Sequence, residues 1–185
     1  MSSPQALSEA DRRLVADWAA DCADRVLALF EAEAQADDRP RDAIARTRAF
    51  ARGELDAAGE IRRRFVAGRA AHAAGSPAGV AAARAAAQAA GVAHMGAHAL
   101  GAAAYAARAA ALAAPARPAA LADEIAWQVG HMTPEVKAAL RQLPPVGQDP
   151  SGPLGSGLLA SGDLGSVIRA IQAAIGVTPT ASEAK

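Results

Sequence analysis

The chain has 185 residues, of which 52% are hydrophobic but only 3% aromatic, and its formal net charge is +0. This length suits one domain with its own core, and the balanced charge argues against a general binder of nucleic acid or of anionic membranes, which is usually basic. Because Cys22 is the single cysteine, an internal disulfide and a cysteine-based metal site are excluded. The first residues, MSSPQALSEADRR, lack the apolar core of a signal peptide, so we expect a cytoplasmic protein.

The first predicted element is a long helix that Ser8 caps and that extends to about Gln35. Residues 1–7 before it are expected to form a disordered lead. Apolar side chains recur along the helix at three- and four-residue steps, which predicts one buried stripe. This stripe consists of Leu14, Trp18, Cys22, Val26, Leu29 and Phe30.

Two further helices are predicted before residue 75. The run DDRP at 37–40 begins the first of them, because proline is tolerated in a first turn where its missing N–H does no harm. This helix is expected to end near Gly53, and the next is expected over 54–74. Ser76 and Pro77 repeat the same start signal and open the central part of the chain.

The central segment, 80–114, reads VAAARAAAQAAGVAHMGAHALGAAAYAARAAALAA and is uncharged between Arg84 and Arg108. Alanine favours the helix, and a stretch this apolar should lie at the centre of the fold with other helices around it. Gly91 and Gly96 predict a break into two helices. The segment is long enough for a bilayer, but alanine and glycine dominate it and it carries two histidines, so no membrane span is expected.

The C-terminal part is expected to hold a helix over 118–130, with Leu121 and Ile125 facing inward, and a short helix from Pro134 to Leu143. Together these elements predict an all-α fold. We expect a compact multi-helix bundle of about six to eight helices around the central Ala/Gly-rich helical segment, with residues 1–143 as the helical bundle domain.

Residues 144–162 are rich in proline, glycine and serine and predict a flexible linker. A C-terminal amphipathic helix is expected over 163–176, and 177–185 are expected to form a tail. One face of this helix is apolar and predicts docking, either on the same chain, which we favour, or in a homodimer. The face consists of Leu164, Val167, Ile168, Ile171 and Ile175.

The histidines are the first candidates for a site. His94 and His98 are four residues apart, so on a continuous helix both rings project from one face, which is the ligand spacing of a helical metal site. Met95, however, stands where zinc proteases carry glutamate. We therefore expect no metal and no cofactor, and two largely buried histidines bonded to backbone or to Tyr105. The alternative is a pocket for a small molecule or a metal near His72, His94, His98 and Tyr105.

The arginines are the second candidates, because they crowd the chain between residues 39 and 69 beside an acidic first helix. Charge pairing on a solvated face is favoured, and an arginine surface for an acidic partner is the alternative. The residues that we expect to contribute to binding there are Asp38, Arg39, Arg41 and Arg48. The sequence shows no glycine-rich phosphate loop, nucleophile elbow or carboxylate pair beside a base, so no catalytic residue is expected.

Several segments resemble a bacterial family of small helical immunity proteins linked to polymorphic toxin systems. They are DDRPRDAIARTRAFARGE at 37–54, the alanine and histidine run that closes on Tyr105, EIAWQ at 124–128 and LPP at 143–145. The resemblance covers about Asp37 to Pro145. It implies a non-enzymatic protein that binds and neutralises a cognate toxin. The residues that match the family's motifs are Asp38, Arg39, His94, His98 and Tyr105.

Overall fold

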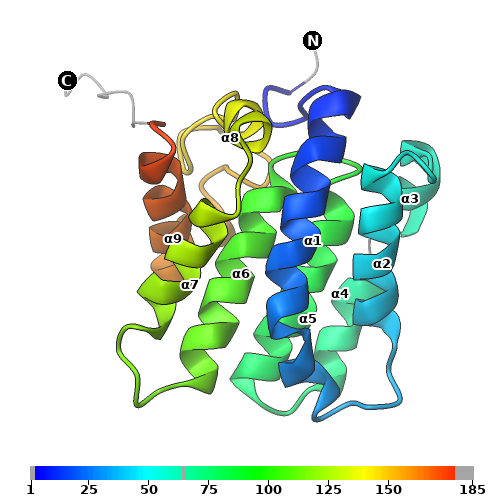
Figure 1. The fold of residues 1–185 in the computed structure, drawn as a ribbon, viewed down its shortest axis with the longest axis vertical. Helices are drawn as coiled ribbons and strands as arrows, with labels where there is room; N and C mark the ends of the chain where they lie inside the picture. Colours follow the sequence, from blue (N-terminus) through cyan, green and yellow to red (C-terminus); the bar gives the residue numbers. More distant parts are fainter. Residues whose placement is uncertain (1–2, 64–65, 178–185) are drawn as a thin grey trace.

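The computed structural model describes residues 3–63 and 66–177 and shows an all-α fold, as the sequence predicted. The predicted tail, 177–185, lies outside this description except for its first residue. Within the described ranges there are nine α-helices, two short 3-10 helices and no strand (Figure 1). In chain order they are α1 (Glu9–Glu31), α2 (Arg39–Ala51), α3 (Ala57–Arg63), α4 (Val66–Ala70), η1 (Ala71–Ala73), α5 (Pro77–Gly91), α6 (His98–Ala113), α7 (Ala120–Gly130), α8 (Pro134–Leu140), η2 (Leu158–Ala160) and α9 (Gly162–Ala174).

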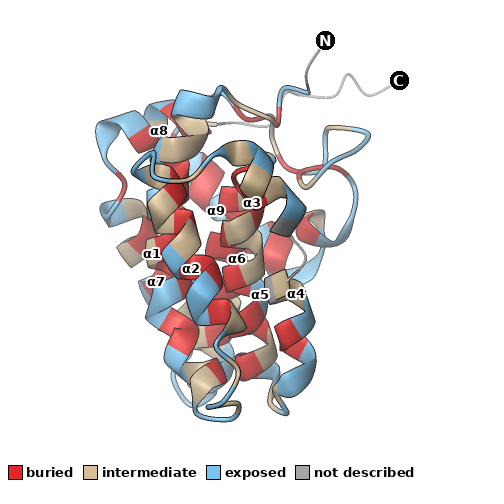
Figure 2. Cartoon of the chain, turned by 90° about the vertical axis from the view of Figure 1, so that its right-hand side faces the viewer, coloured by how far each residue is buried: buried red, intermediate tan, exposed pale blue. Residues whose placement is uncertain are grey.

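The predicted central segment forms the middle of the bundle as the helix pair α5 and α6. Helix α1 packs across both, α2 and α4 cover α5 on one side, and α7 and α9 cover α6 on the other (Figure 1). Every residue from Ala99 to Ala107 is buried, and the buried colour runs through the centre of the molecule in Figure 2. Alanine and glycine allow this close approach of helices because their side chains are so small. Within the described ranges, no helix combines the length and the apolar character that crossing a membrane requires.

The predicted helix starts are confirmed by the caps. The Ser8 and Ser76 hydroxyl oxygens each accept a backbone N–H bond of 3.0 Å from the residue three positions later, and Thr133 caps α8 in the same way. Helix α2 begins where expected, but its N-cap residue, Asp38, makes no side-chain cap bond, and the Asp37 carboxylate accepts the backbone N–H of Arg39 at 3.2 Å. The helix ends before Gly53, whose φ of +80° lies in the left-handed region that glycine tolerates.

The predicted break in the central segment is confirmed, and the N-terminal lead is hydrogen-bonded to the turn that joins the two helices. Helix α5 ends at Gly91 and α6 begins at His98. The backbone oxygens of Gln5 and Ala6 accept N–H bonds of 3.1 Å from Ala97 and Gly96 in this turn. The expectation of a disordered lead is therefore wrong for residues 3–7, because the turn between α5 and α6 leaves backbone N–H groups that the lead satisfies.

The stretch 54–74 was expected to be one helix, but the structure divides it. Helix α3 begins only after Asp56, whose carboxylate accepts the backbone N–H of Gly59 at 2.7 Å. Helix α4 and η1 follow as short separate pieces, and residues 64–65 between α3 and α4 lie outside the described part of the chain.

The predicted linker, 144–162, is fastened to the bundle. Leu154 is fully buried. The side-chain amide of Gln172 in α9 bonds two backbone groups at the start of this segment. It accepts the backbone N–H of Val146 at 3.0 Å and donates to the Pro144 oxygen at 2.9 Å. The flexibility of the segment stays a prediction, but these contacts hold it against the core.

Helix α9 docks on the same chain, as we favoured. All five residues of its predicted apolar face are at most 2% exposed, and the helix packs against α6 and α7. Because this apolar face is covered within the chain, it does not offer the exposed surface that a homodimer through α9 would need.

Replacing Gly101 with leucine is expected to lower the free energy of unfolding by about 1–3 kcal/mol through overpacking. A Cβ atom at Gly101 would lie 2.9 Å from Cδ of Gln88 and 3.0 Å from Cδ1 of Leu159. Chemical denaturation measures the change. The matched control is Gly130→Ala, because a Cβ atom there has no neighbour within 4 Å in the described structure. An unchanged midpoint for Gly101→Leu would contradict tight packing at this position.

Candidate functional site

Three of the chain's four histidines line one surface pocket of about 620 Å³. The pocket lies between α4 with η1 on one side and α5 with the turn into α6 on the other. The described residues that line it are Gly68, Arg69, His72, Ala87, Gln88, Gly91, His94 and His98. The structure thus brings together the three histidines that the alternative interpretation of the sequence grouped.

The predicted burial of the histidines is wrong. His94 is exposed and His98 is half-buried, because the chain leaves the helix at Gly91 and carries His94 outward on the turn. Tyr105, by contrast, is buried at 4% exposure and is not among the pocket's described lining residues. The ring of Tyr105 instead faces the Arg84 guanidinium, at 5.8 Å from the ring centroid.

The two histidines do not lie on one continuous helix, as a helical metal site would require. Helix α6 begins at His98, and His94 lies in the turn before it, so the two rings do not project from the same helix face. Among the described residues, no three histidine, cysteine or acidic side chains gather closely enough to hold a metal ion. The three histidines therefore share a pocket without forming a ligand set for metal.

One pair of side chains in the pocket is held in place by its surroundings. Nδ1 of His98 lies 2.8 Å from Oε1 of Gln88, within hydrogen-bond distance. A Cβ atom at Gly91 would lie 2.9 Å from Cγ of the His98 ring. Glycine at this position therefore leaves the room in which the ring packs against α5.

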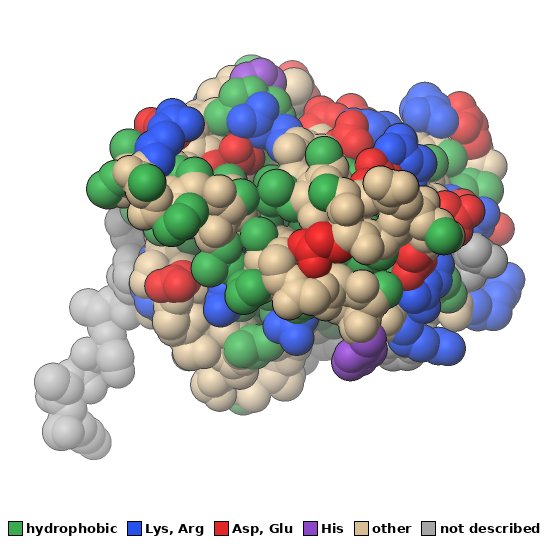
Figure 3. Space-filling view, turned by 90° about the horizontal axis from the view of Figure 1, so that it is seen from below, with side chains coloured by type: hydrophobic (Ala, Val, Ile, Leu, Met, Phe, Trp, Pro, Cys, Tyr) green, Lys and Arg blue, Asp and Glu red, His purple; other side chains and the backbone are tan. Residues whose placement is uncertain are grey.

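The arginines of α2 are ion-paired, as the favoured interpretation predicted. Arg41 contacts Glu31 at 2.6 Å, and Arg48 bridges two acidic residues of α1 at 2.8 and 3.1 Å. Arg39 bonds Asp37, and this hydrogen bond lowers the pKa of the Asp37 carboxyl group. Figure 3 shows the same mixing, with acidic and basic side chains side by side along one edge of the molecule's lower end.

The four residues in and just before α2 that were predicted for binding do not gather at one point. Asp38 is exposed, and Arg39 and Arg41 lie in the first turn of α2, whereas Arg48 lies in its last turn. Their role in binding stays a prediction.

A second hollow, which the sequence analysis missed, lies beside α1. We call it the α1 groove; its volume is about 440 Å³, and it is lined by Arg13, Leu14, Asp17, Trp18, Asp21, Ala51, Arg52, His131, Thr133 and Val136. Leu14 was predicted to be buried but is 41% exposed here. Residues at the end of α2 and at the start of α8 line the groove but leave Leu14 open to solvent. The signal in the sequence was an apolar residue next to charged neighbours, which alone does not distinguish a groove from core.

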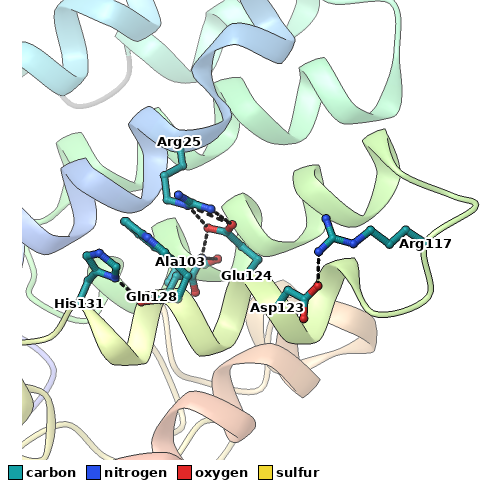
Figure 4. A network of polar contacts seen from close by, with 8 residues as sticks. Arg25, Ala103, Arg117, Asp123, Glu124, Gln128 and His131 are labelled. Atoms are coloured by element: carbon teal, nitrogen blue, oxygen red, sulfur yellow. Dashed lines mark hydrogen bonds and ion pairs between the residues drawn. The ribbon is translucent and has the colours of Figure 1, made fainter.

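Helix α7 turns two polar residues into the core, which the sequence analysis also missed (Figure 4). Glu124 is 5% exposed and Gln128 is fully buried, whereas Leu121 and Ile125 are only half-buried. The Glu124 carboxylate accepts bonds of 2.9 to 3.1 Å from the Arg25 guanidinium.

The same network ties α7 to α1 and α6. Nε2 of Gln128 donates to the Ala103 oxygen at 3.1 Å, and Nε1 of Trp18 donates to the Gln128 backbone oxygen at 2.9 Å. These bonds satisfy most of the buried polar groups between helices that are far apart in sequence, whereas Oε1 of Gln128 has no hydrogen-bond partner in the described structure. We interpret the network as a structural junction, because its bonds join α7 to α1 and α6 within the core.

Cys22 is fully buried, and burial raises the pKa of its thiol well above the ordinary value. A thiol held protonated in the core is a poor nucleophile.

The comparisons with known proteins add one finding. A family model described as Imm-5 like putative immunity protein matches residues 5–135. Searches of curated proteins and of solved structures give no significant match.

Proposed function

Because the chain belongs to the family of Imm-5 like putative immunity proteins, we propose that it binds and neutralises a cognate toxin and catalyses no reaction itself. Membership, which spans residues 5–135, is the observation that carries this proposal. The ion-paired surface of α1 and α2 supports it, because alternating charges favour one partner over others and steer the encounter.

The α1 groove is the surface that we propose for the toxin. Leu14 offers exposed apolar area, and the wall contains the aromatic side chain of Trp18. Charged side chains of both signs surround them, among them Asp21, which pairs with the predicted binding residue Arg48. An apolar centre with a polar rim is the usual anatomy of a protein interface.

The function is tested by expressing each toxin encoded next to this gene in a host bacterium, with and without the protein. We expect the protein to restore growth against one of these toxins and to elute with it as a complex in size-exclusion chromatography. Toxins that all remain lethal and elute alone would contradict the proposed function.

The surface is tested with Leu14→Glu, which is expected to raise the Kd of the complex with the toxin by about tenfold or more. Burial of a leucine contributes roughly 1.5–3 kcal/mol, and about 1.4 kcal/mol corresponds to a factor of ten. Leu158→Glu is the matched control, because this leucine is 62% exposed on η2, away from the groove. Equal affinities of the two variants, both with unchanged melting temperature, would place the toxin elsewhere.

A further inference from the structure

We propose that the pocket between α4 and α5 is a binding site for a small anionic molecule, held through its phosphate or carboxylate group. This site is separate from the α1 groove, and the proposal does not depend on toxin binding. It starts from the pocket's charge. Arg69 and His72 line one wall, His94 and His98 line the other, and none of the described lining residues is acidic. Guanidinium and imidazole groups donate hydrogen bonds to oxyanions.

The sequence around the pocket also lacks acidic residues over a long stretch. From Ile61 to Ala122 the chain contains no aspartate and no glutamate, yet it contains seven arginines. The last acidic residue before this stretch, Glu60, is bonded by Arg46 and lines a different hollow. Along α2, by contrast, the arginines pair with carboxylates. The pocket's walls thus come from a long stretch of the chain that supplies basic side chains and no acidic ones.

The pocket also has a fixed polar side chain at its wall. Oε1 of Gln88 can only accept, so Nδ1 of His98 donates to it across 2.8 Å. Two glycines leave room for this pair, because Cβ atoms at Gly91 and Gly101 would lie 2.9 Å from the His98 ring and from the Gln88 amide carbon. Such support from neighbours is what orients a binding side chain before the ligand arrives.

The pocket's size indicates a molecule rather than a bare ion. Its volume of about 620 Å³ falls within the range of roughly 300–1,000 Å³ that is typical of small-molecule sites. Gly68, Ala87 and Gly91 supply small apolar wall positions beside the cationic groups. The lining therefore suits a compact ligand with an anionic group at its end and a less polar body.

Titration with phosphate and citrate, followed by NMR of the imidazole groups, tests the proposal directly. The chain has four histidines, and three line the pocket, whereas His131 lies in the α1 groove with its ring stacked 3.9 Å from Trp127. We expect the three pocket signals to shift with saturation for at least one of the two anions while His131 stays in place. Sodium chloride at equal ionic strength controls for screening. Signals that do not move, or four signals that move alike, would overturn the proposal.

A pair of arginine variants sharpens the test. Arg69→Gln removes a guanidinium from the pocket wall, and Arg84→Gln removes an exposed arginine of α5 that is not among the described lining residues. A charged hydrogen bond accounts for about a tenfold change in affinity, so Arg69→Gln is expected to weaken binding about tenfold and Arg84→Gln to leave it unchanged. Both side chains are exposed, and an unchanged melting temperature shows that the fold is intact. Equal binding by the two variants would overturn the assignment.

Discussion

Replacing Arg25 with methionine is expected to lower the free energy of unfolding by about 3 kcal/mol. The guanidinium is the ion-pair partner of Glu124, whose side chain is only 6% exposed, so its loss leaves a buried carboxylate without its cation. Arg25 also covers the ring of Trp127, at 3.8 Å from the centroid. Methionine keeps the length of the side chain and the helix preference, so urea denaturation reports mainly the lost charge.

Arg117→Met is the matched control for this prediction. Arg117 pairs with Asp123, the neighbour of Glu124 on α7, but the two side chains are 65% and 52% exposed. Exposed pairs contribute about 0–1 kcal/mol, so a small change is expected. The double variant Arg25→Met with Glu124→Gln is expected to regain part of the loss, because no charge then remains buried. Equal losses for Arg25→Met and Arg117→Met would show that Glu124 does not need its cation.

Replacing Gln5 with alanine is expected to lower the free energy of unfolding by about 2–3 kcal/mol. The Gln5 side chain is fully buried. It accepts the backbone N–H of Leu154 at 2.9 Å and donates to the Ser151 oxygen at 2.6 Å. Alanine leaves the buried Leu154 N–H without an acceptor and opens a cavity. Thermal and urea unfolding measure the loss.

The control is Gln35→Ala, because Gln35 is exposed after α1. Amide hydrogen exchange adds a local readout, since the Leu154 N–H is expected to exchange faster in Gln5→Ala than in the native protein. If Leu154 stays equally protected and stability is unchanged, the lead does not fasten the loop that follows α8.

Local chemistry in the sequence determined much of the helical framework. Ser8, Ser76 and Thr133 are followed by helices because their hydroxyl oxygens satisfy the first free N–H groups, and each start was predicted. The alanine-rich segment was placed at the centre because it is apolar and uncharged between Arg84 and Arg108. The break after Gly91 followed from the low helix preference of glycine. Each of these signals acts within a few residues of the position that it determines.

Contacts between distant parts of the chain decided the rest. The apolar periodicity of α7 predicted that Leu121 and Ile125 face inward, and both pack half-buried against the core. Glu124 is buried more deeply, because Arg25, 99 residues away, pairs with it. The place of Gln5 was equally hidden, because its acceptor and donor partners lie in the loop near residue 154. The histidine pocket and the α1 groove exist only where separate helices meet. A sequence pattern records which residues avoid water, whereas the partner that each one finds depends on how the helices pack.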